Sequence, residues 1–219
     1  MKKITLFIAS LFFVSFAHAQ SDDEVEFVEI QAAYNACITF RDAAITGDTA
    51  LIRPAAEGLR GAQTCDFASL RCSAGSEESL NGHLVFNVAF ADSLADGRDA
   101  YGKADDLNRT STTRGQYDDG KVHSKTCFVR AGKSTKYTFP SRGHQELAVV
   151  AESGGLVTVK IHVTNRAGLD VRYDDTKDVH QGRPQRKAVF ELPTDRTNTV
   201  ELEIVNCGKK DCSFVVISN

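Results

Sequence analysis

The sequence contains no tryptophan, and only 4 of its 219 residues are prolines. The absence of tryptophan removes the side chain most often used as a sugar-stacking platform. Four prolines and 16 glycines are too few for a fibrous or disordered chain. The Gly-x-Ser-x-Gly and His-Glu-x-x-His patterns of common hydrolases are also missing. Because 42% of the residues are hydrophobic and 25% are charged, we expect a packed globular core.

The apolar run at the start of the chain is too short to span a bilayer comfortably. It extends from Ile4 to Phe16, follows Lys2 and Lys3, and ends before Ala17-His18-Ala19. This pattern predicts a secretory signal peptide over residues 1–19, cleaved after Ala19. The residues that follow are polar and acidic, which argues against a retained anchor. We therefore expect an exported protein, periplasmic or extracellular, with no stable membrane insertion.

All six cysteines lie in the expected mature chain: Cys37, Cys65, Cys72, Cys127, Cys207 and Cys212. An even number in an exported protein predicts a disulfide framework. Cys207 and Cys212 flank a four-residue turn between two strand-like runs, so we expect a bridge at the mouth of a hairpin. We expect Cys65 and Cys72 to close a short polar loop, which leaves Cys37 and Cys127 to tie a helix to the β region. Other connectivities stay open, and zinc is disfavoured because no His pair accompanies these spacings.

Residues 20–75 are expected to form a helical hairpin and a cysteine loop. Ser21-Asp22-Asp23-Glu24 has the form of a capping box, and apolar residues then recur every three to four positions. Gly47 is expected to end this helix, and Asp48 to cap a second helix. Pro54 either kinks the second helix or restarts it.

Residues 76–219 are expected to form a β-sandwich. The stretch 83–91 alternates apolar and polar residues and predicts a strand, while the weak apolar signal over 92–120 predicts a long loop. Eight short strand patterns follow, separated by turn residues: 122–129, 135–139, 146–151, 156–163, 169–173, 187–192, 200–205 and 213–217. Such spacing is typical of a sandwich or jelly roll. The expected fold class is α+β, an N-terminal helical hairpin followed by an antiparallel jelly-roll-like β-sandwich.

Residues 122–219 carry a pattern of segments in a fixed order. Phe128-Val129-Arg130-Ala131-Gly132 precedes Tyr137-Thr138-Phe139, and Thr199 to Asn206 precedes a final strand that ends the chain. This pattern resembles the bacterial pre-peptidase C-terminal type of β-sandwich module. The resemblance implies a role in binding or export and not in chemistry. The stretch Glu146-Leu147-Ala148-Val149-Val150 departs from the Asp-Leu-Asp-Leu-type strand usual in that module.

The two halves of the mature chain differ in charge. Residues 20–120 hold 8 Lys and Arg against 18 Asp and Glu, whereas residues 121–219 hold 16 against 11. Either the acidic helical arm lies against the basic sandwich, or each half is a solvated surface. The mature chain is acidic overall and its basic residues alternate with acidic ones, so nucleic acid is a poor partner. We expect an unidentified protein or glycan as partner, and an anionic glycan is possible.

Few residues carry a chemical signal. Asp170, Asp174, Asp175 and Asp178 lie in and after a predicted strand and are a calcium candidate, with a solvated turn as the alternative. Gly132-Lys133-Ser134 fails the phosphate-loop pattern and predicts a turn with a left-handed glycine. No catalytic residue and no other cofactor is predicted.

Three functions follow as hypotheses. The first is a non-enzymatic exported binding or accessory protein. The second is a small secreted hydrolase whose site is assembled from loops around His123, His144 or His180. The third is a calcium-dependent adhesion module that uses Asp170 to Asp178.

Overall fold

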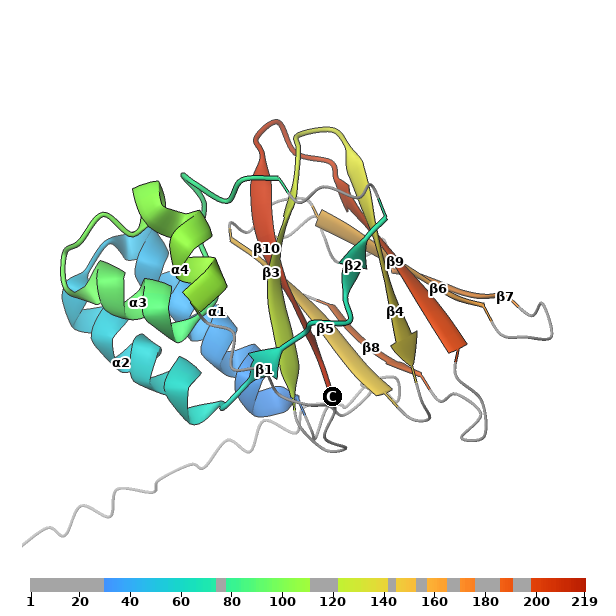
Figure 1. The fold of residues 1–219 in the computed structure, drawn as a ribbon, viewed down its shortest axis with the longest axis horizontal. Coiled ribbons are helices and arrows are strands. Elements are labelled where there is room, and N and C mark those ends of the chain that lie inside the picture. Colours follow the sequence, from blue (N-terminus) through green and yellow to red (C-terminus); the bar gives the residue numbers. More distant parts are fainter. Residues whose placement is uncertain are drawn as a thin grey trace, which may run out of the picture.

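The computed structural model describes residues 30–73, 78–110, 122–141, 145–152, 157–164, 170–175, 186–190 and 198–219. A layer of helices packs against one sheet, and a second sheet packs against the other face of the first (Figure 1). The predicted α+β class, a helical hairpin followed by an antiparallel jelly-roll-like sandwich, is confirmed. The predicted signal peptide lies outside the described residues.

Within the described residues, the sandwich consists of two five-stranded sheets. Sheet A has the order β1-β3-β10-β5-β8, and sheet B has the order β2-β4-β9-β6-β7. All described pairs are antiparallel except β1 with β3. The bounds are β1 Cys65–Asp66, β2 Arg71–Cys72, β3 His123–Val129, β4 Ser134–Ser141, β5 Gln145–Ala151, β6 Val157–Thr164, β7 Asp170–Asp175, β8 Arg186–Phe190, β9 Asn198–Asn206 and β10 Cys212–Ser218. Strands β3 to β10 correspond to the eight predicted strands.

The predicted helical hairpin is formed by α1 (Gln31–Thr46) and α2 (Thr49–Gly61). Gly47 ends α1 with a φ of 68°, and the Asp48 carboxylate caps α2 by accepting from the Ala50 N–H at 2.8 Å. Helix α2 continues through Pro54. The capping box expected at Ser21 lies outside the described residues. Among the helices that the structure describes, none is long and apolar enough to cross a membrane.

Sheet A is buried on both faces. The outer face packs against the helices through four fully buried residues: Ala148, Val150, Val215 and Ile217. The alternate residues of β5 and β10 face sheet B in a second core. Every residue of these two strands is therefore buried, which explains why their sequences are almost continuously apolar.

The prediction of a strand over 83–91 is wrong. Leu84 to Phe86 is a buried segment without regular secondary structure, and two of its N–H groups donate to side chains. The Leu84 N–H donates to Glu152 Oε2 at 2.9 Å, and the Phe86 N–H donates to Thr126 Oγ1 at 3.0 Å. Asn87 then caps helix α3 (Val88–Ala95) by accepting from the Phe90 N–H. Apolar spacing in so short a run does not distinguish the two structures.

The prediction of a loop over 92–120 is wrong for its first part. Helix α3 continues to Ala95, and a 3-10 turn η1 (Tyr101–Lys103) leads into α4 (Ala104–Thr110). The residues that suggested a loop lie at the ends of these short helices. Gly97, after α3, has a φ of 69°, and Asp99, before η1, accepts from the Gly102 N–H at 2.8 Å. The helical layer therefore extends to residue 110, past the expected boundary at 75.

The Cys207–Cys212 bridge is not formed in the structure. Strand β9 belongs to sheet B and β10 to sheet A, so the segment between them is an arch from one sheet to the other and not a hairpin turn. Cys207 is exposed, whereas Cys212 is buried in the core between the sheets. The buried Asn206 amide organises the arch instead, donating to Lys210 O at 2.8 Å and accepting from the Gly208 N–H at 2.8 Å.

The two other predicted bridges are not formed either. Cys65 lies in sheet A and Cys72 in sheet B, because the segment that joins them also passes between the sheets. Cys37 packs in the helical core on one side of sheet A, and Cys127 packs in the core between the sheets on the other side. Cys65 and Cys72 were paired because they are close in the sequence, and Cys37 and Cys127 because they were left over. Neither criterion measures the distance between the two cysteines in the folded protein.

Candidate functional site

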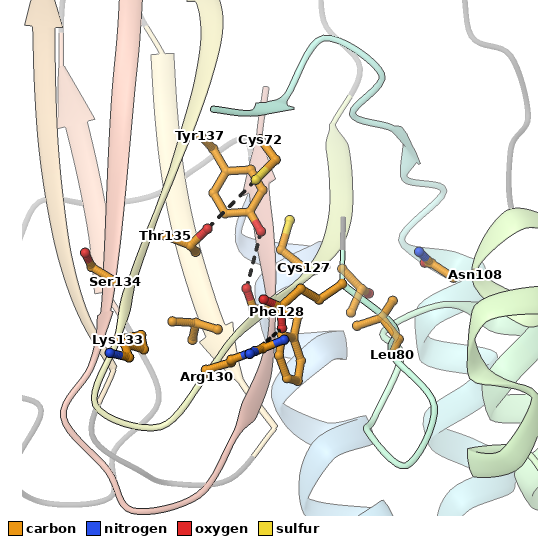
Figure 2. Close-up of a pocket in the computed structure, with 13 residues that line it drawn as sticks. Cys72, Leu80, Asn108, Cys127, Phe128, Arg130, Lys133, Ser134, Thr135 and Tyr137 are labelled. Atoms are coloured by element: carbon orange, nitrogen blue, oxygen red, sulfur yellow. Dashed lines mark hydrogen bonds and ion pairs between the residues drawn. The ribbon is translucent and has the colours of Figure 1, made fainter. Parts of the chain in front are cut away.

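A cavity of about 330 Å³ opens at the sandwich edge that adjoins the helical layer. Figure 2 shows its walls: one side is formed by residues of β3 and β4, and Leu80 and Asn108 approach from the helical side. Cavities of this size hold small ligands in many proteins. The cavity is therefore the candidate site of this chain.

The inner wall of the cavity is formed by Tyr137, Cys72 and Cys127. Tyr137 is 4% exposed, and its hydroxyl donates to Phe128 O at 3.4 Å. Burial raises the pKa of this phenol well above its ordinary value, and the two neighbouring thiol groups raise it further. Tyr137 consequently remains a neutral phenol at physiological pH.

The rim of the cavity is polar and carries charge. Arg130 Nε lies 2.7 Å from Glu78 Oε2, which joins the β3–β4 turn to the segment before Leu80. Glu78 raises the pKa of Arg130, so this guanidinium stays charged. Lys133 follows in the same turn, where Gly132 adopts the predicted left-handed conformation with a φ of 64°. Arg130, Lys133, Asn108 and Ser134 therefore all line one cavity and supply two cations, an amide and a hydroxyl.

A second, smaller cleft continues from this cavity along β3. It has a volume of about 210 Å³ and shares Asn108 and Thr126 with the first. Asn87, Arg109 and Lys125 also line it. We call these two neighbouring cavities together the β3 groove, which lies where the helical layer meets the sandwich edge.

His83 and Glu152 form a half-buried pair beside the β3 groove. His83 Nδ1 lies 2.8 Å from Glu152 Oε1, and the same carboxylate accepts from the Leu84 and Ser213 N–H groups. The hydroxyl of Ser213 is fully buried and donates to Leu84 O at 2.6 Å. Because that hydroxyl is already engaged and inaccessible, this arrangement joins the two layers and does not present a nucleophile.

Of the residues predicted for a hydrolase site, only His123 lies in the part of the chain that the structure describes. His123 Nδ1 lies 3.3 Å from the carbonyl oxygen of Asp66, and its ring packs on Phe67. His144 and His180 lie outside the described residues.

The calcium candidates remain a prediction. Asp170, Asp174 and Asp175 belong to the edge strand β7, for which only the backbone is described, and Asp178 lies outside the described residues. In the part of the chain with described side chains, no group of three His, Cys, Asp or Glu residues is placed to hold a metal ion.

The sequence alone did not mark Arg130, Lys133 or Tyr137 as ligand-binding residues. Arg130 and Lys133 were noted only as parts of a strand pattern and a turn, and Tyr137 only as part of an alternating strand. The one sequence feature that pointed to a binding site here was the pair of cations, Arg130 and Lys133, on either side of Ala131-Gly132. Asn108 and Glu78 join the site through folding alone, since they are distant from β4 in the sequence.

No protein-family model matches this chain, and no protein of curated function matches it. Part of the chain is similar to solved structures. A mutant of PliG, a periplasmic inhibitor of g-type lysozyme from Escherichia coli, is 15% identical, with 48% of this chain and 93% of that chain covered and a TM-score of 0.30.

Two further similarities are equally weak. The carbohydrate-binding module TmCBM61, solved with β-1,4-galactotriose, is 10% identical over 47% of this chain and 83% of that chain, with a TM-score of 0.26. A de novo designed double-stranded β-helix is 14% identical over 44% of this chain and 99% of that chain, with a TM-score of 0.26. At such scores nothing about ligand or activity transfers to this chain.

Proposed function

We propose that this chain is a non-enzymatic exported binding protein that holds an acidic oligosaccharide in the β3 groove. The signal-peptide pattern of residues 1–19 supports export. The observation that carries the binding role is the polar groove where the helical layer meets the sandwich, which has Arg130 and Lys133 at its rim.

The chemistry of the groove fits an acidic sugar. Arg130 and Lys133 supply charged donors for a carboxylate, and the guanidinium can form two parallel hydrogen bonds with it. Asn108, Ser134 and Thr135 supply amide and hydroxyl groups for the ring hydroxyls of a sugar. Glu78 competes with the ligand for Arg130, so binding requires the exposed ion pair to open at small cost.

Calorimetric titration of the full-length mature protein with oligogalacturonate tests this function. We expect binding of oligogalacturonate, weakening as salt is added, and none of the neutral galacto-oligosaccharide of equal length. Replacing both cations, in Arg130→Ala/Lys133→Ala, is expected to weaken binding at least about tenfold.

Lys136→Ala is the matched control. Lys136 is also an exposed lysine of the same strand region, but it lies on the outer face of sheet B and pairs with Glu201 at 2.7 Å. This variant should bind as tightly as the parent. Equal binding of acidic and neutral sugars, or equal loss in both variants, would contradict the proposed site. If neither sugar binds, the ligand is not an acidic oligosaccharide of this kind.

A further inference from the structure

Two cysteines from different sheets converge on the buried ring of Tyr137. Cys72 of β2 lies opposite Tyr137 of β4 in the antiparallel register. Residues opposite each other in such a pair project from the same face of the sheet. Because Tyr137 faces the core between the sheets, Cys72 faces it too, and its sulfur lies 3.9 Å from Thr135 Oγ1.

Cys127 approaches the same ring from sheet A. It lies opposite Phe214 in the register of β3 with β10, and the Phe214 ring packs edge-on against Tyr137 with centroids 5.9 Å apart. The Cys127 thiol is also one of the groups that raise the pKa of Tyr137. Both cysteines line the same cavity, and Figure 2 shows the Cys72 sulfur at the Tyr137 ring and the Cys127 sulfur near its hydroxyl end.

We propose that Cys72 and Cys127 are a redox pair that closes to a disulfide across the edge of the sandwich. Such a bond needs the two Cα atoms within about 7 Å of each other. Strand β2 has only two residues and is the outermost strand of sheet B, so it can move toward β3 while the central strands stay in place.

Oxidation proceeds by exchange with a small disulfide such as oxidised glutathione. The Cys72 thiol is partly exposed in the cavity, loses its proton and attacks one sulfur of the oxidant, releasing one thiolate. The buried Cys127 thiol loses its proton and attacks the sulfur of Cys72 in this mixed disulfide, releasing the second thiolate. The pair loses two electrons and two protons, and the small disulfide is reduced to two thiols.

Two of the other cysteines, Cys37 and Cys65, are less well placed to react with this pair. Cys37 lies beyond sheet A in the helical core, where burial raises its pKa to about 12 and keeps it protonated. Cys65 is the rival partner of Cys72 because it is close in the sequence, but it lies in the other sheet and does not line this cavity.

Peptide mapping of the full-length mature protein distinguishes the two pairings. The protein is incubated with excess oxidised glutathione, remaining thiols are blocked with iodoacetamide, and the sample is digested with trypsin without reduction. Trypsin cuts after Arg60, Arg71, Arg98, Lys125 and Arg130, so Cys65, Cys72 and Cys127 fall in the separate peptides 61–71, 72–98 and 126–130.

We expect peptide 72–98 linked to peptide 126–130, with a mass lower than the two thiol peptides by two hydrogen atoms, and loss of the link on reduction. A link from 72–98 to 61–71 would show that the rival pairing is correct. Recovery of 72–98 and 126–130 as alkylated peptides would show that the pair does not close. Either result overturns the proposal.

Two serine variants provide the controls. Oxidation of the parent is expected to raise its thermal midpoint, because the new bond constrains the unfolded chain. Cys65→Ser should keep both this rise and the link between the two peptides, whereas Cys72→Ser should lose both. The partly exposed position of Cys72 makes it tolerant of serine. If Cys72→Ser retains a midpoint that falls on reduction, the stabilising bridge lies elsewhere and the proposal is wrong.

Discussion

Sheets A and B share one core but meet different surroundings on their outer faces. In β10 of sheet A the residues Phe214 to Ile217 are all fully buried, because the helices cover the outer face. In β9 of sheet B the buried residues Val200, Leu202 and Ile204 alternate with the partly exposed Glu201 and Glu203. A continuous apolar run therefore marks the strands beneath the helices, and an alternating run marks the solvated face.

This difference explains the apolar stretch from Glu146 to Val150. The stretch is β5, which has the helical layer on its outer face and sheet B on its inner face. Two carboxylates lie at or beside the ends of β5 and join it to that layer. Glu146 Oε2 accepts from the Ile30 N–H at the start of α1, and Glu152 accepts from the Leu84 N–H.

Pairing of an acidic arm with a basic sandwich, one of the two alternatives that the charge pattern left open, describes this contact poorly. The layers meet through an apolar core, and its buried carboxylates belong to the sandwich. The Glu78–Arg130 pair follows the expected polarity but lies at the exposed rim of the β3 groove. Its contribution to stability is expected to be small.

The same substitution in the two sheets should give the largest contrast. Val150→Asp places a carboxylate in the helix-facing core, where Val150 is fully buried, and is expected to cost about 5 kcal/mol or more. Val205→Asp, on the partly exposed outer face of sheet B, is expected to cost about 1 kcal/mol. Urea denaturation followed by circular dichroism measures both. Similar losses would show that the helices do not shield sheet A.

Truncation of Phe40 tests whether the layers unfold together. Phe40 is fully buried in α1 and meets the rings of Phe86 and Phe90 with centroids 6.4 Å away in each case. Phe40→Ala is expected to cost about 3–4 kcal/mol. Because β5 and β10 belong to both cores, calorimetry should show a single transition at a lower temperature. Two separated transitions would mean that the helical layer unfolds on its own.

Removal of the Glu152 carboxylate should have the next largest effect. Glu152→Ala leaves the Leu84 and Ser213 N–H groups without their acceptor and is expected to cost about 2–3 kcal/mol. Glu201→Ala is the control on sheet B, because it removes a carboxylate paired with an exposed lysine and should cost less than about 0.5 kcal/mol. Urea midpoints of the two variants should differ clearly, and equal midpoints would contradict the role of Glu152 as a joint between the layers.

Asp105 should make a smaller, pH-dependent contribution. Burial opposes its ionisation, but hydrogen bonds from the Ser79 hydroxyl and the Leu80 N–H hold the pKa of this carboxyl below its ordinary value. The stabilisation is therefore present above the unfolded pKa of about 3.9 and is lost as pH falls through the folded value. Allowing for solvent screening, Asp105→Asn should cost about 1 kcal/mol at neutral pH.

Urea denaturation of the parent and Asp105→Asn at a series of pH values measures this contribution. The difference in stability between them should shrink as the pH is lowered below about 4. A difference that stays constant or grows in acid would contradict the assignment.

The sequence predicted the strands after residue 122 well because alternation and turn residues are local signals. It failed at Leu84 to Phe90, where the same alternation belongs to an irregular buried segment and the start of a helix. It also failed at Cys207 and Cys212, since a short turn between two strands looks the same whether it forms a hairpin or an arch between sheets. The candidate site was missed because its residues come from both layers.

Near neighbours along the chain determined the helix ends at Gly47 and Asp48 and the positions of the eight principal strands, because caps, turns and alternation act over a few residues. Tertiary structure alone decided which strands share a sheet, which face the helices cover, and which side chains line the β3 groove. These outcomes depend on contacts such as that of Ile30 with Glu146, which lie 116 residues apart. Local residue preferences carry no information about such distant partners.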